Sequence, residues 1–131
     1  MDAKNYKEFR EDFIERTFAL SDKKRIEYTE GNQNADVLWN FKNIANKLGM
    51  TAIQILSVYL LKHISSLFQF FKKPNEKYSE PIEGRIMDII NYLLLLCALI
   101  KTTPQPNDNN TKRIGEESSR AVRNGADGTE L

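Results

Sequence analysis

The stretch Pro81-Ile-Glu-Gly-Arg85-Ile-Met-Asp88-Ile-Ile-Asn91-Tyr92-Leu-Leu-Leu-Leu-Cys97-Ala-Leu-Ile100-Lys101 is apolar on nearly every side when it is wound into a helix. Pro81 suits the first turn of such a helix, where its missing N–H costs nothing. A helix that is apolar all round must be covered on every side. A chain of this size has few helices to do so, and we therefore expect an all-α, compact bundle that associates into a homo-oligomer.

Two helices are predicted in the first half of the chain. Residues 4–20 carry apolar side chains at steps of three and four, which indicates one apolar stripe. Residues 21–30 either continue this helix or form another. A second helix is predicted to begin within residues 34–36 and to end at Leu48, because Gly49 suits the left-handed residue that closes a helix.

A third helix is predicted to start immediately afterwards. Thr51-Ala-Ile-Gln54 has the spacing of a capping box, and Pro74 and Asn75 supply a stop. With the apolar stretch as the last helix, the bundle has about four helices. The short links favour antiparallel neighbours in an up-and-down arrangement.

Composition limits the class of protein. The 131 residues suit one domain, and 19 basic against 18 acidic residues give a net charge of +1. This balance argues against general nucleic-acid binding but leaves a small anionic ligand open. The single cysteine, Cys97, excludes a disulfide within the chain and is expected to act as a small core hydrophobe. Residues 1–102 are predicted as the helical domain and 103–131 as a disordered polar tail, since the latter contain few apolar residues.

No membrane partner is expected from the sequence. The first residues have no apolar segment of the secretory type. The apolar stretch of residues 86–100 is shorter than the ~20 residues that a helix needs to span a bilayer. We therefore expect a cytoplasmic protein.

The polar residues of the last helix are the first candidate site. Helical spacing places Arg85, Asp88, Asn91 and Tyr92 on neighbouring parts of one face. One interpretation is an Arg85–Asp88 ion pair that fixes helix register. The other is a pocket in which Arg85 binds a phosphate and Asp88 binds a metal or a ligand donor. Gly84 favours the second, because a glycine within a helix usually allows close approach of a ligand or another helix.

Two further candidates lie upstream. Lys62 and His63 are either ordinary helix residues or contacts to a phosphate or base; as the only histidine, His63 cannot build a histidine metal cluster. For Trp39 and Lys42, one interpretation is a polar loop, a helix cap and a core tryptophan; the other is a site in which Trp39 stacks on a base and Lys42 reaches a phosphate. The chain lacks a phosphate-binding glycine loop, a dinucleotide fingerprint, a nucleophile elbow and a zinc-protease motif. No catalytic residue is assigned.

The stretch from Ser79 through Glu83, Arg85, Asp88, Asn91 and Tyr92 resembles the last core helix of phage-encoded proteins related to the MazG-like, all-alpha nucleoside triphosphate pyrophosphatases and nucleotide-modification-associated proteins. Residues 34–42 and 59–63 are also similar to segments of small phage proteins, so the resemblance covers roughly residues 27–100. It implies a helical oligomer, a nucleotide ligand and Mg²⁺ held by carboxylates from two helices.

The chain departs from that family pattern at the metal ligands. Asp88 matches the aspartate of the Glu-x-x-Asp element, but Arg85 stands at its glutamate position. The Glu-Glu-x-x-Glu element has no match, since residues 51–71 contain no acidic residue. Hydrolysis in this group relies on several carboxylates that hold Mg²⁺ against the polyphosphate. The departure favours nucleotide binding over cleavage.

Three hypotheses follow. The first is a non-catalytic nucleotide-binding phage protein of the infected bacterial cell that requires no cofactor and sequesters a host immune signal such as a cyclic dinucleotide, an anti-defence sponge. The second is a Mg²⁺-dependent nucleoside triphosphate pyrophosphohydrolase with Asp88 and Glu83 as metal ligands. The third is a helical protein-interaction module whose apolar last helix docks onto a partner.

Overall fold

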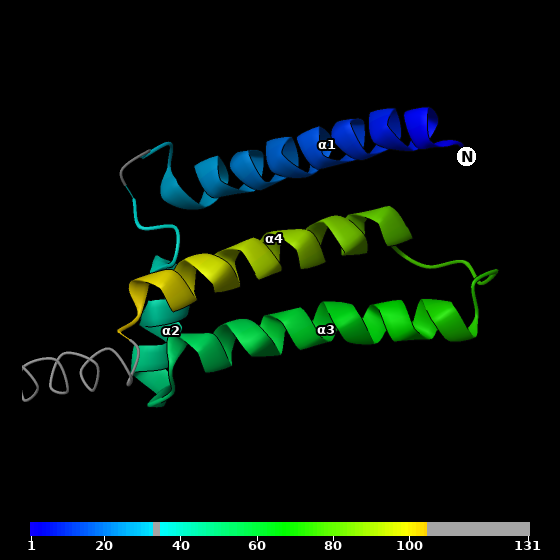
Figure 1. Ribbon diagram of the computed structural model, residues 1–131. Helices are drawn as coiled ribbons and strands as arrows, with labels where there is room; N and C mark the ends of the chain where they lie inside the picture. Colours follow the sequence, from blue (N-terminus) through cyan, green and yellow to red (C-terminus); the bar gives the residue numbers. More distant parts are fainter. Residues whose placement is uncertain (33–34, 105–131) are drawn as a thin grey trace, which may run out of the picture. The chain divides into compact units, whose positions relative to one another are not determined.

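The computed structural model describes residues 1–32 and 35–104, which form four α-helices and no strand. The helices are α1 (Ala3–Thr29), α2 (Trp39–Leu48), α3 (Ala52–Lys72) and α4 (Ile82–Thr102) (Figure 1). Residues 1–100 form one compact unit, and the packing described below lies within it. The all-helical prediction is confirmed. The predicted tail, apart from Thr103 and Pro104, lies outside the described residues.

Helix α1 is one continuous helix of 27 residues, so residues 21–29 extend the first predicted helix. Its start is capped by Asp2, whose carboxylate accepts a hydrogen bond from the Asn5 N–H at 2.8 Å. Its end is marked by Glu30, which adopts a left-handed conformation (φ 51°) and donates its N–H to the Ile26 carbonyl. These local contacts satisfy backbone groups at both helix ends.

Helix α2 begins at Trp39, later than predicted, because a turn precedes it. The Asp36 side chain accepts from the Leu38 N–H at 2.9 Å, and the Trp39 N–H donates to the Asp36 carbonyl at 3.0 Å. The predicted stop is confirmed: Gly49 is left-handed (φ 64°). Asn34, part of the predicted start, lies outside the described residues.

Helix α3 starts with the predicted capping box. The Gln54 N–H donates to Thr51 Oγ1 at 3.2 Å, and the Thr51 N–H donates to Gln54 Oε1 at 2.9 Å. The chain bends by 108° between α2 and α3. The expectation of antiparallel neighbours is therefore wrong for this pair, because the two residues between Gly49 and the start of α3 turn the chain without reversing it.

The link from α3 to α4 is anchored by Tyr78. Its hydroxyl donates to the carbonyl of Lys73 at 2.7 Å and lies 3.1 Å from that of Gln69. Pro81 immediately precedes α4, and its carbonyl accepts from the Gly84 N–H at 3.1 Å. Proline is favoured at the start of a helix, because the N–H that it lacks would have no partner within the helix there.

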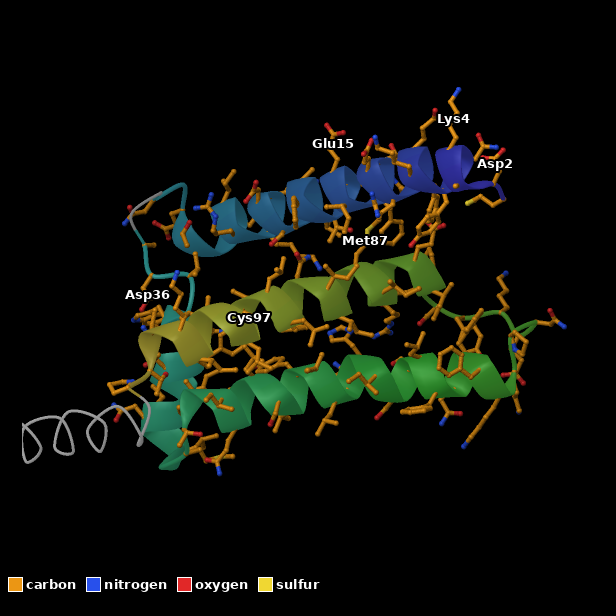
Figure 2. All side chains as sticks on the ribbon, in the orientation of Figure 1. Asp2, Lys4, Glu15, Asp36, Met87 and Cys97 are labelled. Carbon is orange, nitrogen blue, oxygen red and sulfur yellow. The ribbon has the colours of Figure 1, made fainter. Side chains whose placement is uncertain are left out.

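The main core lies where α2, the first half of α3 and the end of α4 meet. Its buried members are Leu38, Phe41, Ala45, Ile55, Leu56 and Leu99. On the α1 side the buried residues are Phe13, Thr17 and Met87, and Figure 2 shows Met87 on the side of α4 that faces α1. Helix α4 thus lies between α1 and α3 (Figure 1).

Within the described residues, one side of α4 carries exposed apolar side chains. Leu93, Leu94 and Ile100 are 46%, 49% and 45% exposed, and Cys97 is also exposed. The prediction that Cys97 is a core residue is therefore wrong: apolar neighbours in sequence do not bury a side chain that lies on the open side of its helix. Among the described residues, no single helix has the length and hydropathy of a membrane span; α2 and α3 reach them only together, across their bend.

Candidate functional site

Three helices each contribute one side chain to the centre of the candidate site. The Asp88 carboxylate of α4 lies 2.8 Å from Lys24 Nζ of α1 and 3.9 Å from His63 Nδ1 of α3. The Asp88 and His63 side chains are only 20% and 13% exposed. A largely buried carboxylate requires such partners, because an isolated buried charge is costly.

Four charged groups near His63 affect its pKa. Burial lowers the pKa of His63; the Asp88 carboxylate opposes this change, while Arg85, Lys62 and Lys24 add to it. Three cations and one carboxylate therefore act on a single imidazole. In the described part of the chain, His63 Nδ1 is buried and has no hydrogen-bond partner. We call Lys24, Lys62, His63, Arg85 and Asp88 the cation cluster.

Aromatic rings adjoin the cation cluster. The Tyr92 ring lies 5.2 Å from the His63 ring and 6.2 Å from the Tyr59 ring, the latter nearly parallel at 24°. Phe41 meets Tyr92 edge-on at 6.4 Å. Such pairings fix ring orientation. They connect the polar cluster to the main core through α2.

Arg85 lies at the other end of the site, in a hollow beside the α3–α4 link. Its guanidinium is 3.0 Å from the Glu80 carboxylate and is 20% exposed. The hollow has a volume of about 170 Å³ and is lined by Ser66, Gln69, Phe70, Tyr78, Ser79, Glu80, Ile82 and Arg85. The Arg85–Asp88 ion pair that one interpretation of the sequence predicts is not formed. Arg85 pairs with Glu80, and Asp88 pairs with Lys24.

The structure brings most of the predicted α3 and α4 site residues together. Lys62, His63, Arg85, Asp88 and Tyr92 share the interactions described above. Asn91 is partly buried on the same helix. Sequence reasoning missed Lys24, because it is one of many charged residues on α1 and its partner is 64 positions away.

Trp39 and Lys42 belong to a different region, at the start of α2. Lys42 Nζ is 2.6 Å from the Asp36 carboxylate. This hydrogen bond and that from the Leu38 N–H lower the pKa of Asp36. The Trp39 side chain is 61% exposed, so it is not the core tryptophan of the alternative interpretation. Neither residue shares a described contact with the cation cluster.

The Mg²⁺ implied by the family resemblance does not fit the side chains present. Asp88 faces Lys24 and His63, and Glu83 lies 3.8 Å from Arg16. In residues 1–32 and 35–104, no three His, Cys, Asp or Glu side chains gather where a metal ion could bind. Mg²⁺ is held through carboxylate oxygens and water, and here the two carboxylates face Arg16 and Lys24 and not a shared centre. From the sequence, Gly84 is expected to allow close approach of a ligand or another helix. A Cβ added at Gly84 meets no atom within 4 Å, so no described helix approaches it closely.

No family model, curated protein or solved structure matches the chain. The site must therefore be interpreted from its own geometry and charge.

Proposed function

We propose that this protein binds a nucleotide at the cation cluster and does not cleave it. The observation that carries the proposal is the cation excess around His63: Lys24, Lys62 and Arg85 against the carboxylate of Asp88. Glu80 offsets part of the charge of Arg85 but is itself mostly exposed. A focused positive site of this kind attracts phosphate even though the whole chain has a net charge of only +1.

The neighbouring groups suit the rest of a nucleotide. Arg85 is the residue best shaped for bidentate contact with a phosphate. The Tyr59 side chain is 36% exposed and lies beside the Tyr92 ring, which gives a base a surface on which to stack. The Asp88 carboxylate accepts hydrogen bonds and suits an amino group of the base or a ribose hydroxyl.

The absence of cleavage in this proposal rests on the donor set. Metal-assisted phosphoryl hydrolysis uses carboxylates to hold the metal ions against the phosphates. Here the described carboxylates nearest the site, Glu80, Glu83 and Asp88, are each within 4 Å of a basic side chain. Binding without turnover corresponds to sequestration. We extend the proposal to a phage protein that sequesters a host immune nucleotide such as a cyclic dinucleotide.

Isothermal titration against mono-, di- and cyclic nucleotides tests the proposal. Arg85→Gln and Lys24→Gln are each expected to weaken binding about 10-fold or more, because a charge-assisted hydrogen bond contributes ~1.5–3 kcal/mol. Lys47→Gln, a change at an exposed lysine on α2, is the matched control and leaves affinity unchanged. Absence of binding heat with the whole panel would refute the proposal.

A further inference from the structure

The open side of α4 carries a regular apolar repeat. Ile86, Ile90, Leu93, Cys97 and Ile100 follow one another at intervals of four, three, four and three residues. We call these five residues the α4 seam. Leu93 and Ile100 are 46% and 45% exposed and Cys97 is exposed, whereas Ile86 and Ile90 are partly buried. An average interval of 3.5 residues is the spacing by which one helix packs lengthwise against another in a coiled coil.

The α4 seam lies on a different side of α4 from the contacts already described. At 100° per residue, Cys97 is about 180° around the helix from Asp88. Met87 and Asp88 face α1, while Tyr92 and Leu99 pack toward α3 and α2. Helices α1 and α3 lie on either side of α4 (Figure 1), and within the described residues they leave Leu93, Cys97 and Ile100 of the seam exposed.

The charge pattern of α4 specifies what can cover the seam. Between Asp88 and the last turn, α4 contains no charged residue. A covering helix must be equally free of charge along this length, because an unpaired charge against an apolar surface is costly. The same seam in a second copy of the chain meets that requirement and has the matching repeat.

The charged residues at the two ends of α4 indicate whether the two α4 helices run parallel or antiparallel. Its first turn contains the acidic Glu83 and its last turn the basic Lys101. Glu83 lies 3.8 Å from Arg16 but is 60% exposed, which leaves it accessible to a second cation. Antiparallel packing places each Glu83 near the Lys101 of the other copy, whereas parallel packing places like charges together. The midpoint between these two residues falls at position 92, next to Leu93 of the seam.

We propose that two copies of this chain pair through their α4 seams, antiparallel and about a two-fold axis near Leu93. The interface is isologous, with the same surface used by both copies. The cation cluster faces away from the seam, so the dimer has two independent sites. This pairing does not depend on the proposed nucleotide binding.

Light scattering coupled to size-exclusion chromatography tests the pairing. The native protein is expected to have twice the mass of the 131-residue chain, and Leu93→Asp to have the mass of one chain while its circular dichroism stays helical. Val58→Asp is the matched control: Val58 is 59% exposed on α3, and this variant stays dimeric. A monomeric native protein, or a folded dimer of Leu93→Asp, overturns the proposal.

Cysteine crosslinking tests the direction without a disruptive substitution. In the antiparallel dimer each Cys97 lies five residues from the axis at position 92. The two Cys97 residues are therefore ~15 Å apart along the helices, given a rise of 1.5 Å per residue. Mild oxidation is therefore expected to leave the native dimer uncrosslinked. The Leu93→Cys, Cys97→Ser double variant places thiols near the axis and is expected to crosslink. Efficient crosslinking through native Cys97 with none through position 93 contradicts the antiparallel pairing.

Discussion

Helix α4 packs against other helices on two sides, and different interactions stabilise the two contacts. Toward α2 and α3 the contact is a cluster of six buried apolar residues, of which Leu56 is fully buried. Toward α1 the buried residues are only Phe13, Thr17 and Met87, and two ion pairs, Lys24–Asp88 and Arg16–Glu83, supplement them. The first side provides the stable scaffold. The second provides a charged partner for the candidate site and has less apolar surface to hold it.

The largest expected effect is on the apolar side. Leu56→Ala is expected to lower the free energy of unfolding by about 3 kcal/mol, because Leu56 is fully buried and its removal leaves a cavity. Urea denaturation measures this change. Val58→Ala, at a side chain that is 59% exposed, is the control and changes stability by less than ~0.5 kcal/mol. Equal losses in the two variants would remove the distinction between core and surface.

A smaller effect is expected on the α1 side. Phe13→Ala is expected to cost less than the ~3–5 kcal/mol typical of a phenylalanine in a closed core, since a helix with a limited apolar contact can relax around the change. The loss should be local. Hydrogen exchange is expected to become faster in α1 and to stay unchanged in α2 and α3. Uniformly faster exchange in all helices would show that α1 is part of one cooperative core.

The ion pair at the site is expected to contribute less. Lys24→Gln is expected to lower stability by about 1 kcal/mol, because Lys24 is 46% exposed and solvent screens its attraction to Asp88. Molar salt should reduce this difference, since it weakens the native pair. Lys7→Gln breaks the exposed Lys7–Glu11 pair and serves as the control with no measurable loss. The same loss in both variants would show that Asp88 gains nothing from its burial beside Lys24.

The smallest effect concerns pH. Burial holds the pKa of His63 below its ordinary value, so the unfolded chain binds a proton more readily than the folded one. This contribution to stability is present above the ordinary histidine pKa of about 6.5 and is lost as pH falls through the folded value. Urea denaturation at pH 7.5 and 5.5 should show a larger acid loss for the native protein than for His63→Gln. Identical losses would contradict the assignment of neutral His63 to the folded state.

Local chemistry accounts for what could be predicted from the sequence. The capping box of Thr51 and the stop at Gly49 depend on residues within one helical turn, and the structure confirms both. The grouping of Lys62 and His63 with Asp88 also follows once α3 and α4 are neighbours.

Long-range packing decided the rest. The pairing of Lys24 with Asp88 joins residues 64 positions apart, which no local spacing encodes. Asp88 therefore pairs with residues of α1 and α3 and not with Arg85 of its own helix, which lies beside Glu80 of the preceding link. The exposure of Cys97 depends on which side of α4 its neighbours cover. Each of these outcomes is set by the relative placement of helices.

Equilibrium dialysis with recovery of the ligand tests the central claim most directly. The native protein is dialysed against a cyclic dinucleotide and, separately, against a nucleoside triphosphate with Mg²⁺; bound ligand is then released by denaturation and identified by chromatography. The account predicts depletion of at least one free nucleotide and its recovery intact, with depletion reduced in Arg85→Gln. No depletion of either nucleotide, or recovery of a cleaved product that the native protein forms, would contradict it.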